Sequence, residues 1–193
     1  MEKNNKIFAL ILVLFAAVIF LGFSLFKSIQ RNEELRSLIP YLLPGEKIET
    51  LALICVDEKD QDITALEKDR LYLLYVFPRT KCTVCDKNLV VLKKVQKLLK
   101  GDISILGILL KTPTEAMDFA QKASLNFPIY VPGEIEKFID LVRIKMNLSQ
   151  AIICTGNEVR RIEMGDLTGG KAGELVKLLR RLNEEMISKR RTN

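Results

Sequence analysis

The sequence predicts an α/β domain built on a central mixed sheet with helices on both faces. Two continuous apolar runs, 71–77 and 103–110, have the length and composition of strands buried on both faces. Between them, residues 83–100 repeat apolar side chains at spacings of three and four, which is typical of a helix. Such alternation of strand and helix favours parallel strands. Near the end of the chain, Thr155-Gly156-Asn157 is a hairpin signal that adds antiparallel strands.

Turn and cap residues set the limits of these elements. Pro78 ends the first buried strand, because proline cannot donate to a sheet ladder. Gly101 ends the helix, because glycine favours a helix C-terminus. Thr112-Pro113-Thr114-Glu115 is a capping box with proline at the first helical position, and it predicts a second helix. The remaining elements are a strand at 48–56, a polar turn at 57–61, an extended segment at 127–131, a short helix from Pro132-Gly133 through Leu141, strands at 151–154 and 158–164, and an amphipathic helix at 171–187.

The N-terminal segment is predicted to cross a membrane. Residues 7–26 are twenty consecutive residues without a charge. At about 1.5 Å per residue such a helix spans roughly 30 Å, the thickness of the hydrocarbon core. A cleaved signal peptide is the alternative, because Gly22-Phe23-Ser24 has the small-x-small form of a cleavage site. Lysine and arginine are nearly balanced on the two sides of the segment. From a single N-terminal anchor before a large domain, we expect a cell-membrane protein whose domain lies outside the cytoplasm.

The chain therefore divides into five predicted parts. These are a short tail at 1–6, the transmembrane anchor at 7–26, a juxtamembrane linker at 27–44, the folded domain at 45–187 and a basic tail at 188–193. The net charge of +6 is modest and spread along the chain, so we expect no nucleic-acid partner. The absence of histidine excludes Ser-His-Asp triads, Cys-His pairs and histidine-ligated zinc or haem.

The segment Cys82-Thr83-Val84-Cys85 carries the predicted chemistry. Its two thiols lie one turn apart at the start of a helix, where unpaired backbone N–H groups and the helix dipole stabilise a thiolate. We expect Cys82 to be the attacking nucleophile and Cys85 the resolving thiol. Arg79 and Lys81 add positive charge that favours the same thiolate. A purely structural disulfide between the two cysteines is the alternative.

The other two cysteines, Cys55 and Cys154, each stand alone in an apolar strand. A buried free cysteine behaves as a small hydrophobe, and a disulfide between the two is the alternative. Zinc would need four ligands, and only these two could complete a set with the paired cysteines. Because they are isolated in separate strands, we expect no metal site. The predicted dithiol chemistry implies no dissociable cofactor.

With these residues the chain resembles thioredoxin-fold proteins, and most closely the membrane-anchored thiol-disulfide oxidoreductases of the TlpA/ResA type, among the redoxin (AhpC/TSA-like) proteins. The resemblance implies a thioredoxin-like fold over 45–187 and disulfide exchange with protein thiol or disulfide substrates. It also implies electrons from a membrane or soluble dithiol donor. The segments that carry it are Asp62–Leu66, Leu71–Phe77, Cys82–Cys85, Ile103–Leu110, Phe127-Pro128 and Ile152–Val159.

The chain departs from this family at four positions. Lys81 stands where the family usually has an aromatic residue directly before the first cysteine. Val76 stands where thioredoxins commonly have a buried acid, six residues before that cysteine. Asn88 stands where some family members have an acid, three residues after the second cysteine. The substrate loop, where the family has a cis-proline facing the disulfide, is Leu148-Ser149-Gln150 and lacks proline. The missing aromatic residue, buried acid and cis-proline favour the alternative of a non-catalytic thioredoxin-like binding module.

A further alternative lies within the same fold. Peroxiredoxins carry Pro-x-x-x-Thr-x-x-Cys, and here Pro78 is followed by Cys82 and Cys85 at that spacing. Cys85 falls on the peroxidatic position, whereas Cys82 replaces the threonine that binds peroxide. The resemblance therefore favours dithiol exchange over a thiol peroxidase that would use Cys85.

Overall fold

The computed structural model describes residues 19–23, 27, 42–48, 50–57, 60–78, 83–99, 101–144 and 148–192. The chain forms two compact units, Met1–Pro40 and Tyr41–Asn193. In the first unit, residues 19–23 are helical. No helix within these described ranges is long and apolar enough to cross a membrane. Most of the predicted anchor at 7–26, together with the tail before it and most of the linker after it, falls outside them, so the anchor stays a prediction.

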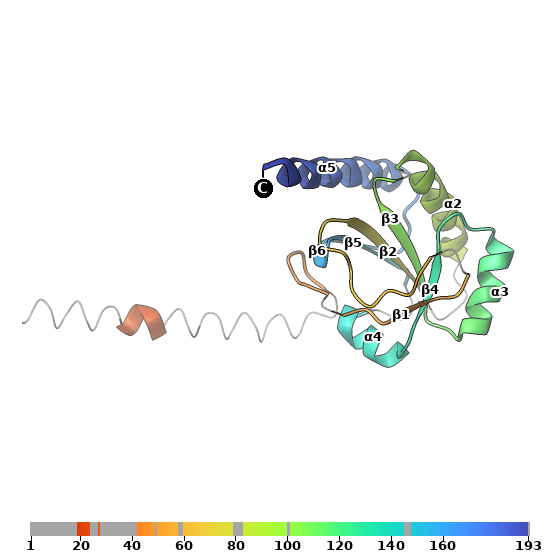
Figure 1. Ribbon diagram of the computed structural model, residues 1–193, viewed down its shortest axis with the longest axis horizontal. Coiled ribbons are helices and arrows are strands. Elements are labelled where there is room, and N and C mark those ends of the chain that lie inside the picture. The colour runs from red at the N-terminus through yellow and green to blue at the C-terminus, as the bar shows by residue number, and fades with distance from the viewer. Residues whose placement is uncertain are drawn as a thin grey trace, which may run out of the picture. The chain divides into compact units, whose positions relative to one another are not determined.

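The second unit is built on a six-stranded mixed sheet with the strand order β1-β4-β3-β2-β5-β6. The central strands β2, β3 and β4 run parallel, whereas β1 and β5 are antiparallel to the strands they flank and β6 is antiparallel to β5 (Figure 1). The predicted α/β class with a mixed sheet is therefore confirmed. The strands are β1 (Leu53–Cys55), β2 (Leu71–Phe77), β3 (Ser104–Leu109), β4 (Ile129–Pro132), β5 (Gln150–Thr155) and β6 (Glu158–Met164).

Helices cover both faces of this sheet. They are α2 (Thr83–Leu98), α3 (Pro113–Ala123), α4 (Ile135–Val142) and α5 (Gly170–Thr192). Helices α2, α3 and α5 pack against one face and α4 against the other (Figure 1). The last helix continues beyond its predicted end at 187, so the predicted basic tail at 188–193 is helical through Thr192. Its lysine and arginine residues lie near the helix C-terminus, where cations are favourable.

Strand β2 supplies both halves of the core, and all seven of its residues are buried. Successive side chains on a strand point to opposite faces of the sheet, so this strand divides between the two halves. The prediction of a strand buried on both faces is confirmed. The side chains on the α2 side are Leu71, Leu73, Tyr75 and Phe77, and those on the α4 side are Tyr72, Leu74 and Val76.

The first strand is much shorter than predicted. Among the described residues of the expected strand 48–56, only Leu53–Cys55 forms a strand that pairs with a neighbouring strand. Ile48 and Leu51 are buried in the α4-side core, but their backbone N–H groups donate to carbonyl oxygens in loops. Apolar side chains in this segment therefore reflect burial rather than pairing in the sheet.

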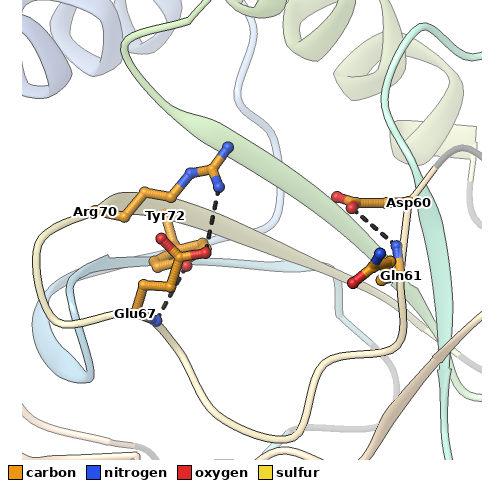
Figure 2. Close-up of polar contacts among 5 residues, drawn as sticks. All are labelled: Asp60, Gln61, Glu67, Arg70 and Tyr72. Atoms are coloured by element: carbon orange, nitrogen blue, oxygen red, sulfur yellow. Dashed lines mark hydrogen bonds and ion pairs between the residues drawn. The ribbon is translucent and has the colours of Figure 1, made fainter.

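Local polar contacts hold the segment between β1 and β2 (Figure 2). The Glu67 backbone N–H donates to the Tyr72 hydroxyl at 3.1 Å, and the Glu67 carboxylate pairs with Arg70 at 3.6 Å. Asp60 accepts a hydrogen bond from the Gln61 backbone N–H at 2.8 Å. The Tyr72 hydroxyl is therefore bonded on the α4 side of the sheet.

The capping box and the hairpin turn are both confirmed. The Thr112 hydroxyl accepts from the Glu115 backbone N–H at 3.4 Å, and the Glu115 carboxylate accepts from the Thr112 backbone N–H at 3.1 Å. In the hairpin, Gly156 has a φ of +58°, and a Cβ atom there would lie 2.5 Å from the Lys68 carbonyl oxygen. Glycine is therefore required at this turn both by conformation and by space.

Candidate functional site

The first turn of α2 carries the second cysteine of the predicted pair. The helix begins at Thr83, so Cys85 lies within the first turn and Cys82 directly precedes it. Cys85 is only 7% exposed and belongs to the core on the α2 side. Cys82, Lys81 and Arg79 lie outside the described residues, so their roles as nucleophile and as thiolate-stabilising cations stay predictions.

Tyr75 is a β2 residue on the same side of the sheet as Cys85. Its side chain is fully buried, and its hydroxyl accepts a hydrogen bond from Asn88, which lies one helical turn after Cys85. Val76, six residues before the first cysteine, faces α4. A shift of one residue along a strand moves a side chain to the other face. On the Cys85 side of the sheet, this part of β2 therefore presents the phenol of Tyr75.

Asn88 is the centre of a fully buried polar network next to this cysteine. Its Nδ2 donates to the Tyr75 hydroxyl at 2.9 Å, to Ser149 Oγ at 3.3 Å and to the Gly165 carbonyl at 2.7 Å. Its Oδ1 accepts from the Leu167 backbone N–H at 2.8 Å. Ser149 Oγ in turn donates to the Gly165 carbonyl at 3.1 Å. One amide thus joins α2 to β2, to the loop before β5 and to the turn after β6.

The Tyr75 hydroxyl remains protonated throughout the physiological pH range. Burial raises the pKa of Tyr75 far above the usual value of a phenol, hydrogen bonds from Ser149 and Asn88 oppose this shift, and the neighbouring Cys85 thiol adds to it. A protonated phenol next to sulfur can donate a hydrogen bond to it. It cannot serve there as a base at neutral pH.

The predicted substrate loop contributes one side chain to this network. Ser149 is buried and bonded as described, whereas Leu148 is 44% exposed. Gln150 is the first residue of β5 and pairs with Val76, so it faces the α4 side, away from the cysteine. Its buried amide makes no hydrogen bond with any described residue. No cis peptide bond occurs within the described ranges.

The remaining cysteines are free thiols in separate strands. Cys154 in β5 is fully buried, and burial raises its pKa to about 12. Cys55 in β1 is half-buried, its thiol donates to Asp57 Oδ1 at 3.4 Å, and burial raises its pKa. The prediction of a small buried hydrophobe is confirmed for Cys154, and the alternative of a disulfide between the two is wrong. In the part of the chain that the structure describes, no group of three or more Cys, Asp or Glu side chains could hold a metal ion.

Reasoning from the sequence missed Tyr75 as a site residue and treated Asn88 only as a missing acid. A signal for Asn88 was available, because a residue three positions after Cys85 shares its helix face. Gly165 and Leu167 offered no signal, since their bonds to Asn88 span 77 and 79 residues of sequence.

A comparison with protein families finds one match. The sequence profile of the AhpC/TSA family matches residues 44–146, which is more than half of the chain. Among curated protein sequences no significant relative was found.

Several solved structures are similar to this chain. A putative protein disulfide isomerase from Bacteroides thetaiotaomicron has a TM-score of 0.58 at 16% identity, over 74% of this chain and 89% of that one. Peroxiredoxin Q from Xanthomonas campestris has a TM-score of 0.54 at 12% identity, over 75% and 99%. A putative thiol:disulfide interchange protein DsbE from Chlorobium tepidum has a TM-score of 0.53 at 13% identity, over 74% and 98%. At these identities the likeness establishes the thioredoxin-like fold alone.

Proposed function

This chain belongs to the AhpC/TSA family, and on that premise we propose that it is a thiol-disulfide oxidoreductase that acts on protein substrates through Cys82 and Cys85. The observation that supports this best is the setting of Cys85, a buried thiol in the first turn of a helix beside polar donors. Burial protects a thiol from bulk oxidants, whereas neighbouring donors favour its thiolate. A resolving cysteine needs both properties.

The proposed reaction transfers two electrons from the protein dithiol to a client disulfide. The Cys82 thiolate attacks one client sulfur, forms a mixed disulfide and releases the other client sulfur as a thiolate. Cys85 then loses its proton and attacks the Cys82 sulfur, which forms the Cys82–Cys85 disulfide and releases the second client thiolate. A dithiol donor, in the membrane or in solution, restores the reduced pair by the reverse exchange.

The proposal also includes the cellular location of this reaction. Residues 7–26 would tether the domain to the cell membrane as a single span, with the domain outside the cytoplasm, where clients form disulfides. Cell fractionation tests this part. We expect the full chain to resist alkaline extraction from membranes and a chain that starts at residue 27 to be released.

A thiol peroxidase acting through Cys85 is the second candidate, favoured by Pro78 directly after β2 and seven residues before Cys85. Its thiolate would attack a peroxide oxygen, which gives a sulfenic acid and an alcohol. Cys82 would then condense with the sulfenic acid and release water. The replacement of the peroxide-binding threonine by Cys82 weakens this candidate.

A redox titration of the full chain in detergent tests the proposal, with peptide mass mapping of the trapped thiols. We expect a reversible Cys82–Cys85 disulfide with a potential between about −270 and −120 mV. Cys82→Ser should abolish exchange with a model disulfide. If Cys82→Ser still reduces one equivalent of an alkyl peroxide and its Cys85 is trapped as a sulfenic acid, the peroxidase is correct instead. If the two thiols never pair but partners still bind, the chain is a binding module.

A further inference from the structure

A groove between α2 and the N-terminal part of α5 exposes apolar side chains to solvent. It has a volume of about 570 Å³, and Val90 and Leu98 line it from α2. Val90 is 54% exposed and Leu98 is 59% exposed, more than any other large apolar side chain described in the second unit. Single exposed apolar residues are normal on a protein surface, whereas an apolar groove with a polar rim is typical of an interaction site.

The α5 side of the groove is formed by residues with short side chains. Ala172, Gly173 and Val176 line it, and their spacings of three and four place them on one face of the helix. A Cβ atom added at Gly173 would meet nothing within 4 Å outside its own stretch of helix, so the space above this residue is open. Large side chains of a partner can therefore enter between the two helices, as the side chains of one helix fill the grooves of another.

Two lysines give the groove a positive rim. Lys87 and Lys94 are the only charged side chains that line it in the described part of the chain, and both are exposed. They are seven residues apart on α2, which is about two turns or roughly 10.5 Å along the helix, and Val90 lies between them. Asp86 and Glu174 are next in sequence to residues of the groove but do not line it. The groove is therefore complementary to a partner that combines apolar side chains with carboxylates.

One end of the groove adjoins the candidate site. Lys87 follows Cys85 by two residues on α2. Thr168, which also lines the groove, directly follows Leu167, whose backbone N–H donates to the buried Asn88 at 2.8 Å. A polypeptide bound in the groove would therefore have one end close to the start of α2, where the two cysteines lie.

We propose that this groove binds an acidic amphipathic helix of the protein client and so holds the client beside the dithiol. The proposal rests on the exchange reaction proposed above and names the kind of client that the reaction takes. A matching helix carries apolar side chains at spacings of three and four, which contact Val90 and Leu98, and two carboxylates seven residues apart, which pair with Lys87 and Lys94. An amphipathic helix laid into an apolar groove is a recurring mode of recognition, and the charges add specificity.

The test measures binding of a designed peptide to the full chain in nonionic detergent by fluorescence anisotropy. The labelled probe is a cysteine-free helical peptide that repeats glutamate at heptad positions and leucine three and four residues after each glutamate. A peptide of the same composition, with the leucines spread around the helix, controls for micelles and for net charge. We expect the probe to bind about tenfold more tightly than this control, and its affinity to fall as the salt concentration rises.

Two variants locate the binding surface. Lys94→Glu should weaken binding of the probe about fivefold and strengthen binding of a probe with lysine in place of glutamate. Lys122→Glu, on α3 and outside the groove, makes the same change of charge and should alter neither affinity. Gly173→Leu should fill the groove and abolish binding. Because leucine is a better helix former than glycine, the thermal midpoint should not fall, which separates a blocked groove from a misfolded domain.

Equal binding of the probe and its control, or wild-type affinity in Gly173→Leu, would overturn the inference even if the chain exchanges disulfides normally. If Gly173→Leu instead changes the sedimentation of the full chain and the probe does not bind, the groove is an interface with a second copy and the inference is wrong. Specific binding by a wild type that forms no reversible disulfide would refute the proposed function and leave the groove as the docking surface of a binding module.

Discussion

Cys85 and Cys154 are both buried thiols of the same unit, but their surroundings differ. Cys154 lies in the apolar core on the α4 side, and burial alone raises its pKa to about 12. Cys85 lies on the other side of the sheet, in the same cluster as Tyr75, whose hydroxyl accepts a hydrogen bond from Asn88 at 2.9 Å. Burial alone makes a thiol inert, so the polar network on the side of Cys85 is what distinguishes the surroundings of the two thiols.

The largest expected difference between the two thiols is in turnover. In the full chain, Cys85→Ser should reduce disulfide exchange to the background rate and leave the client trapped on Cys82, because no resolving thiol remains. Cys154→Ala should exchange at nearly the wild-type rate. Both are measured by reduction of a model protein disulfide and by non-reducing gels. Equal loss of turnover in the two variants would show that the different surroundings of the two thiols do not determine which of them takes part in exchange.

The next largest expected effect is on stability, and it compares a buried asparagine with an exposed one. Asn88→Ala leaves the Leu167 N–H and the Gly165 carbonyl without their side-chain partner, and should lower the free energy of unfolding by about 3 kcal/mol. Asn126→Ala removes only an exposed amide that donates to the Lys93 carbonyl at 3.4 Å, and should cost less than about 0.5 kcal/mol. Urea unfolding of both variants measures this. Similar losses would mean that the buried network contributes little to stability.

The smallest effect concerns Cys154 in alkali. Its folded pKa of about 12 lies above the unfolded value near 9.0, so its contribution to stability is complete below pH 9 and is lost as the pH rises toward 12. The loss between pH 9 and pH 10 should be about 1 kcal/mol. Cys154→Val should remove that part of the pH dependence, as measured by unfolding at the two pH values. An unchanged slope in this variant would contradict the raised pKa.

Much of the fold could be predicted because its signals are local. Continuous apolar runs marked β2 and β3, and the capping box at 112–115 marked the start of α3. The hairpin turn at Gly156 was predicted by its three-residue signal. The first strand was overestimated because buried apolar residues such as Ile48 look the same whether or not their backbone pairs in a sheet.

Features of the site that depend on neighbouring residues in the sequence could be predicted, whereas contacts between distant segments could not. The CxxC spacing placed Cys85 correctly at the start of α2. Which side chains of β2 lie on its side of the sheet depends on the face of the strand, and Tyr75 does so, whereas Val76, the position counted back from the first cysteine, faces α4. The partners of Asn88 come from distant turns through backbone groups, which every residue possesses, so their identity carries no signal.

The bond from Asn88 to the Leu167 N–H spans 79 residues, and it bears on how the chain matures. Contacts of such long sequence separation form late, because the entropy of closing the intervening loop must first be overcome. During synthesis, Cys85 and Tyr75 leave the ribosome long before the turn that completes their network. The thiol acquires its final surroundings only when the C-terminal hairpin docks, so completion of this site is coupled to completion of the fold.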